Sequence, residues 1–163
     1  MKPTHVVVGA VALAAAGGLP ANGQLLAHKD LSLATALTIA TTAIDTCKGQ
    51  GYRVSATIVG REGQEIVHLR GDETSPHTWE NSFRKAYTAR TFRRPSGEFA
   101  QQVKDNPTTG QAHLTHVIAN QGALPIKIGD EVIGAVGVSG APGSEKDEAC
   151  AKTGIDKVAD QLK

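Results

Sequence analysis

The sequence is poor in cysteine, in aromatic residues and in net charge, and each shortage excludes a class of protein. Its 163 residues include two Cys, three Phe, two Tyr and one Trp, with a formal net charge of +1. Two cysteines cannot hold a disulfide-rich mini-protein together, and a chain of this length buries enough surface to fold without such a framework. A nearly neutral chain with so few rings also lacks the basic face and stacking platform of a nucleic-acid binder. We expect one compact domain and no nucleic-acid partner.

The common nucleotide-binding and hydrolase motifs are missing as well. The glycines between residues 134 and 140 match neither a phosphate-binding loop nor a dinucleotide fingerprint, and Ser139 lacks the first glycine of a serine-hydrolase elbow. Four histidines have no carboxylate or thiol partner evident in the sequence, namely His28, His68, His113 and His116. An enzyme acting on a small carbonyl compound is therefore the weakest of three functional hypotheses.

No apolar run reaches the roughly 20 residues that span a bilayer, but a shorter one stands at the N-terminus. A mildly basic start at residues 1–5 precedes small apolar residues over 6–16, and small residues stand just before Gln24. We predict a signal peptide over residues 1–23, cleaved to leave a single periplasmic or secreted domain over 24–163. An ordinary N-terminal helix or an uncleaved anchor is the alternative.

The rest of the chain alternates between two kinds of apolar spacing, which predict helices and strands. Helices are expected at 30–50, 77–92, 96–104 and from about 145 to 162, and strands at 52–59, 65–70, 114–119, 124–128 and 131–139. This order has no β-α-β rhythm. We therefore predict an α+β domain with an antiparallel five-stranded sheet and helices on both faces.

The two cysteines fall in the first and last of these helices. If the two helices run antiparallel on one face of the sheet, Cys47 lies near Cys150. In an exported protein, paired thiols are more common than free ones. A disulfide is our preferred interpretation, with free thiols as the alternative.

The most informative stretch is the second helix and the residues that follow it. Its polar stripe consists of His77, Asn81, Arg84, Thr88 and Thr91. Arg93 and Arg94 extend the basic end, and Lys85 stands beside the stripe. An imidazole followed by cations suits haem, because it offers a nitrogen to the iron and guanidinium groups to the propionates. The alternative is an exposed histidine followed by cations that interact with the helix dipole.

One acidic pair is a candidate metal site. Glu145 and Glu148 are three residues apart on the last helix, so their carboxylates share a face suited to hard or borderline cations. The alternative is a solvated acidic helix start.

The chain resembles the GlcG/HbpS-like haem-binding family, which is related to the C-terminal domain of PduO-type corrinoid adenosyltransferases. The matching segments are Lys48-Gly49-Gln50-Gly51-Tyr52-Arg53-Val54, the hairpin 59–71, Lys85-Ala86-Tyr87-Thr88-Ala89, Arg94-Pro95-Ser96, Gln121-Gly122-Ala123-Leu124-Pro125-Ile126 and 132–140. Together they span about residues 31–162. The resemblance implies a profilin-like domain that forms homo-oligomers up to octamers, binds haem, and in some members degrades haem or holds iron. By motif position it implies a ligand role for Thr88.

The leading hypothesis is an exported haem-binding protein that degrades haem or sequesters iron. His77 or Thr88 would ligate the iron, the four basic residues of the second helix would meet the propionates, and the acidic pair would capture released iron. The second hypothesis is a non-catalytic oligomeric module that binds a small organic acid or a corrinoid.

Overall fold

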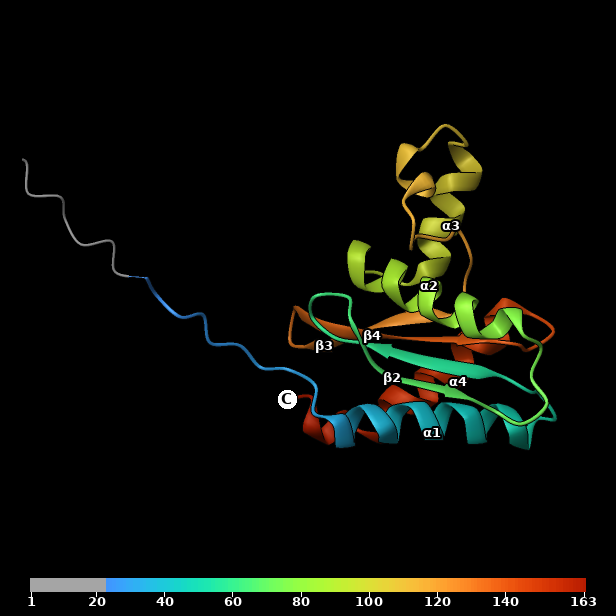
Figure 1. Ribbon diagram of the computed structural model, residues 1–163, viewed down its shortest axis with the longest axis horizontal. Helices are drawn as coiled ribbons and strands as arrows, with labels where there is room; N and C mark the ends of the chain where they lie inside the picture. The colour runs from blue at the N-terminus through green and yellow to red at the C-terminus, as the bar shows by residue number, and fades with distance from the viewer. Residues whose placement is uncertain (1–22) are drawn as a thin grey trace, which may run out of the picture.

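The computed structural model describes residues 23–163 and shows an antiparallel sheet with helices on both faces (Figure 1). The strands are β1 Ser55–Val59, β2 Glu65–Arg70, β3 Ala123–Ile128 and β4 Glu131–Ser139, in the order β2-β1-β4-β3. The helices are α1 Leu33–Gly49, α2 His77–Phe92, α3 Ser96–Asp105 and α4 Ser144–Lys157, with short 3₁₀ turns at Gly110–His113 and Ala159–Gln161. The predicted α+β class and antiparallel sheet are confirmed.

The described sheet has four strands, so the predicted strand at 114–119 is wrong. Backbone groups of this segment bond to side chains of α2 instead of to a neighbouring strand. The Ile118 N–H donates to Thr88 Oγ1 at 2.9 Å, and the Val117 carbonyl accepts from Arg84 at 2.8 Å. The β-branched residues of the segment had suggested a strand, but tertiary contacts decided its conformation.

Helix α2 lies very close to the middle of the sheet, and the reason is a glycine. A Cβ at Gly137 of β4 would stand 2.2 Å from the Ser82 carbonyl oxygen and 2.6 Å from the Ala86 nitrogen. Strand β4 is buried over all but its first residue, and β1 is buried throughout. The missing side chain at Gly137 thus allows the backbones of α2 and β4 to come very close at this crossing.

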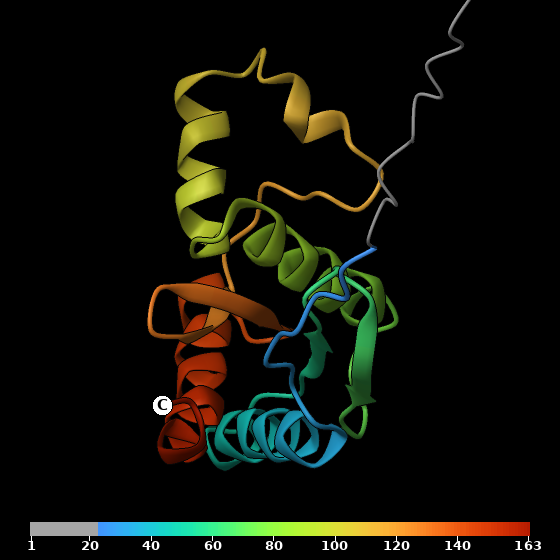
Figure 2. The same ribbon diagram turned by 90° about the vertical axis from the view of Figure 1, so that its left-hand side faces the viewer.

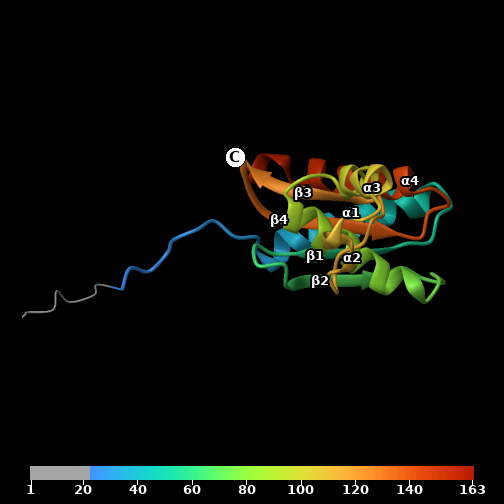
Figure 3. The same cartoon turned by 90° about the horizontal axis from the view of Figure 1, so that it is seen from above.

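Helices α1 and α4 lie side by side over the opposite face (Figures 2 and 3), and a disulfide joins them. Ser32 caps α1, because its side chain accepts a hydrogen bond from the Thr35 nitrogen at 3.1 Å. Near the other end of α1, Cys47 forms a disulfide with Cys150, with 5.7 Å between their Cα atoms. Both cysteines are fully buried. The predicted pairing is confirmed.

A segment that we call the arm, residues 96–120, projects from the α2 side of the domain (Figure 2). At its base, Phe99 stacks on Phe92 with 4.3 Å between ring centroids, and Ser96 Oγ accepts a hydrogen bond from the Ala123 nitrogen at 3.0 Å. The arm is therefore anchored both where it leaves α2 and where the chain enters β3.

The predicted signal peptide lies outside the described residues except for Gly23, so it stays a prediction. Within residues 23–163, no helix is both long enough and apolar enough to cross a membrane.

Candidate functional site

The six residues predicted to hold haem all belong to α2 or to the turn after it, but they do not meet at one place. From His77 to Arg94 is 17 residues, about 25 Å along a helix at 1.5 Å per residue. His77 is exposed at the first position of α2, whereas Thr88 is fully buried eleven residues later. A single ligand is therefore not surrounded by the whole set.

Thr88 uses its hydroxyl to attach the arm to α2. Its Oγ1 donates to the Arg84 carbonyl at 2.8 Å and accepts from the Ile118 N–H at 2.9 Å. A ligand role for Thr88 or for His77 stays a prediction, and the visible role of Thr88 is to position the arm.

Lys85 is buried and its charge is matched inside the protein. Its side chain is 1% exposed, and its Nζ lies 2.8 Å from Asp147 Oδ2 and 3.1 Å from the Val138 carbonyl oxygen. Burial lowers the pKa of Lys85 and raises the pKa of Asp147, and the attraction between the two charges opposes both shifts. Lys85 therefore ties α2 to β4 and α4, and a propionate contact for it stays a prediction.

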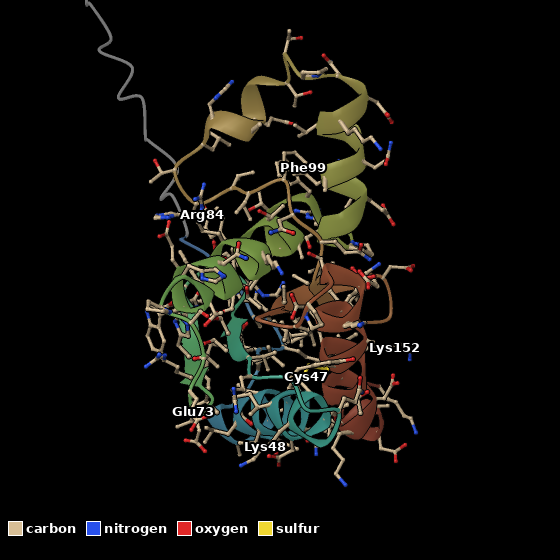
Figure 4. All side chains as sticks on the ribbon, turned by 90° about the vertical axis from the view of Figure 1, so that its right-hand side faces the viewer. Cys47, Lys48, Glu73, Arg84, Phe99 and Lys152 are labelled. Carbon is tan, nitrogen blue, oxygen red and sulfur yellow. A yellow bond between two sulfur atoms is a disulfide. The ribbon has the colours of Figure 1, made fainter. Side chains whose placement is uncertain are left out.

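Two of the predicted arginines also have partners within the protein. Arg84 donates to the Val117 carbonyl at 2.8 Å and lies 3.4 Å from Glu80, and it points toward the arm (Figure 4). Arg94 donates to Gln102 of α3, and its guanidinium lies 6.0 Å from the Phe92 ring centroid. Both residues position the arm.

The basic end of α2 also holds a cation that sequence reasoning missed. Arg90 lies near Arg93, and its buried Nε has no hydrogen-bond partner among the described residues. Burial, followed by repulsion from Arg93, lowers the pKa of Arg90, and Glu62 opposes this shift. Arg93 itself is exposed. This end of the helix therefore favours an anion.

An aromatic cluster beside these cations was missed as well. The His116 ring centroid lies 5.3 Å from those of Phe83 and of Tyr87, which are 5.9 Å apart. The spacing of Phe83, Tyr87 and Arg90 on one helix face was visible in the sequence. Nothing in the sequence showed that the distant His116 would fold back onto this face.

His68 has the carboxylate partner that the sequence did not reveal, so the expectation of none is wrong. Its Nδ1 lies 2.8 Å from Glu65 Oε1, its Nε2 lies 3.3 Å from Ser82 Oγ, and its ring stacks on Trp79. Burial lowers the pKa of His68, and the Glu65 hydrogen bond opposes the shift. The arrangement resembles a nucleophile–base relay, but Ser82 is fully buried and also bonds Thr57 at 2.8 Å. A substrate does not reach that hydroxyl.

A metal role for the acidic pair of α4 stays a prediction. Glu148 lines a shallow hollow of about 350 Å³ with Glu98 and Gln121, whereas Glu145 is not part of its lining. Among residues 23–163, no three His, Cys, Asp or Glu side chains are arranged to hold a metal ion.

A larger groove, of about 670 Å³, lies between the end of α1 and the loop after β2. Its rim carries two ion pairs, Lys48–Asp72 at 3.7 Å and Arg53–Glu73 at 2.9 Å. Because these charges compensate one another, the groove has less to attract an anion than the basic end of α2.

Comparison with known proteins identifies chains that are similar to most of the described domain. A family model described as "Haem degrading protein HbpS-like" matches residues 31–156. An uncharacterised 15.0 kDa protein from the dhaT–dhaS intergenic region of Citrobacter freundii is 31% identical over 103 residues, which cover 61% of this chain and 72% of that protein.

Two crystal structures with similar folds extend this comparison. A double mutant of Streptomyces reticuli HbpS is 30% identical, with a TM-score of 0.78, and the match covers 88% of this chain and 97% of that one. The complex of PduOC with heme is 24% identical, with a TM-score of 0.73, and the match covers 79% and 95% respectively. The second likeness shows the fold alone.

Proposed function

Since this chain belongs to the HbpS-like family of haem-degrading proteins, we propose that it binds haem. The match over residues 31–156 carries the proposal, because it includes the whole sheet and all of α2 and the arm. The structure of PduOC with heme supports it, since that chain has the same fold. The chemistry of α2 is compatible, since it offers aromatic rings, cations and a nearby imidazole.

Adding ferric hemin to the purified protein tests the proposal directly. We expect a saturable Soret shift with a fixed ratio of haem to protomer. Weak binding that does not saturate would contradict haem as the ligand and favour the alternative, a non-catalytic module for a small organic acid or a corrinoid.

The same purified protein can be used to test two further properties, haem degradation and self-association. Haem degradation, supported by the family description, predicts that added peroxide bleaches bound haem faster than free hemin. Bleaching at the rate of free hemin contradicts haem degradation, and iron sequestration would then have no source of iron.

Self-association, up to an octamer, follows from the family resemblance. Light scattering is expected to give a multiple of the monomer mass, and a monomer at every concentration contradicts it.

We further propose that the protein is exported to the periplasm or secreted. The N-terminal apolar run supports this, and so does the disulfide, because such bonds persist in oxidising compartments. When the full chain is expressed in bacteria, the exported fraction is expected to begin at Gln24. A cytoplasmic product that still carries Met1 would contradict export.

A further inference from the structure

One face of α2 combines aromatic and basic side chains. Phe83, Tyr87 and Arg90 stand at positions i, i+4 and i+7, so they share this face. The turn between β1 and β2 borders it on one side, where a Cβ at Gly63 would lie 2.9 Å from the Tyr87 ring. The arm borders it on the other side and contributes His116.

The imidazole of His116 is held in place and remains exposed. Its ring meets Phe83 and Tyr87 edge to face, at interplanar angles of 67° and 70°. The two backbone positions that follow are fixed by Arg84, which binds the Val117 carbonyl, and by Thr88, which binds the Ile118 N–H. His116 therefore belongs to a positioned segment, yet its side chain is open to solvent.

The positive charge lies a short way along the same helix. Arg90 is three residues beyond Tyr87, about 5 Å along the axis. Arg93 follows the last residue of α2 in a left-handed conformation, and it lies close enough to Arg90 for its charge to lower the pKa of Arg90. Neither arginine has a salt bridge within residues 23–163, and the buried Nε of Arg90 has no hydrogen-bond partner there. A ligand that spans this face would meet a nitrogen donor, two rings and then two cations.

We propose that His116 ligates the iron of haem on this face, with the porphyrin against Phe83 and Tyr87 and the propionates toward Arg90 and Arg93. Imidazole nitrogen is an established haem-iron ligand, and guanidinium groups pair well with carboxylates. The inference rests on the proposed function and names its site. It gives Arg84 and Thr88 the role of positioning residues.

The sequence-based candidate His77 does not fit this site. It lies six residues before Phe83 and ten before Tyr87, about 9 and 15 Å along the helix axis, so it stands well outside the ring cluster that holds His116. The two histidines therefore predict different sites, and substitution separates them.

Hemin titration of the full chain with its disulfide intact tests the inference. His116→Ala is expected to weaken hemin binding about tenfold or more and to shift the Soret band. Added imidazole should restore the band, because it replaces the lost ligand. The matched control is His113→Ala, which removes another exposed imidazole of the arm and should leave affinity and spectrum unchanged.

The propionate contacts have a separate readout. Replacing Arg90 and Arg93 by Ala is expected to weaken binding of hemin by about tenfold and binding of hemin dimethyl ester hardly at all. Equal losses for both ligands would overturn this part of the assignment.

The outcomes separate the site from the function. If the wild type binds hemin and His116→Ala gives the same affinity and spectrum, the site is wrong and the proposed function stands. A loss on His77→Ala instead would place the iron at the start of α2. If the wild type itself does not bind hemin saturably, both the site and the proposed function fail.

Discussion

Replacing both Cys47 and Cys150 by Ala is expected to lower the free energy of unfolding by about 4 kcal/mol, in urea titrations monitored by circular dichroism. The bond joins residues 103 apart, so its loss frees a long loop in the unfolded chain. Ala suits the site better than Ser, because both positions are fully buried and a serine hydroxyl would lack a partner.

A reductant provides the control for this prediction. Dithiothreitol should destabilise the wild type by a similar amount and leave the double alanine variant unaffected. A difference of less than about 1 kcal/mol between the wild type and the variant would show that the disulfide contributes little to stability.

The second large effect is expected at the buried ion pair. Lys85→Met should cost about 3–5 kcal/mol, because it leaves the Asp147 carboxylate buried without its cation. Asp147→Leu should also be costly, since it removes the acceptor of the Ala141 N–H as well as the partner of Lys85. Urea titration of each variant measures these losses.

The double variant, Lys85→Met with Asp147→Leu, decides how the pair acts. With no unpaired charge left, its loss should be smaller than the sum of the two single losses, a coupling that a double-mutant cycle reports directly. Strictly additive losses would show that the two residues do not depend on each other.

Much of the fold was predictable because it follows local pattern. The spacing of apolar residues located α1 and α2 closely, and the turn chemistry around Pro95 placed the break between α2 and α3. Even the disulfide was accessible, since the element order placed the two cysteines on adjacent helices. These features depend on short-range periodicity and on simple rules of connection.

The site was less predictable, because its contacts join residues far apart in the chain. Lys85 is a cation on a helix, and only Asp147, 62 residues later, explains its burial. The segment at 114–119 has strand-like residues but takes its hydrogen bonds from α2. His116 looked like an ordinary surface histidine until the arm brought it against Phe83 and Tyr87.

The residues of the arm that would contact a ligand are different from the residues that stabilise the core of the domain. Thr115 and the proposed ligand His116 are exposed, and α2 lies between the arm and the sheet (Figure 2). Thr115→Ala is expected to change the free energy of unfolding by no more than about 0.5 kcal/mol, whereas His116→Ala also loses two edge-to-face contacts, a cost of about 1 kcal/mol. The residue that the arm offers to a ligand can therefore be exchanged without rebuilding the core, so the binding chemistry of this domain can be altered independently of its folding.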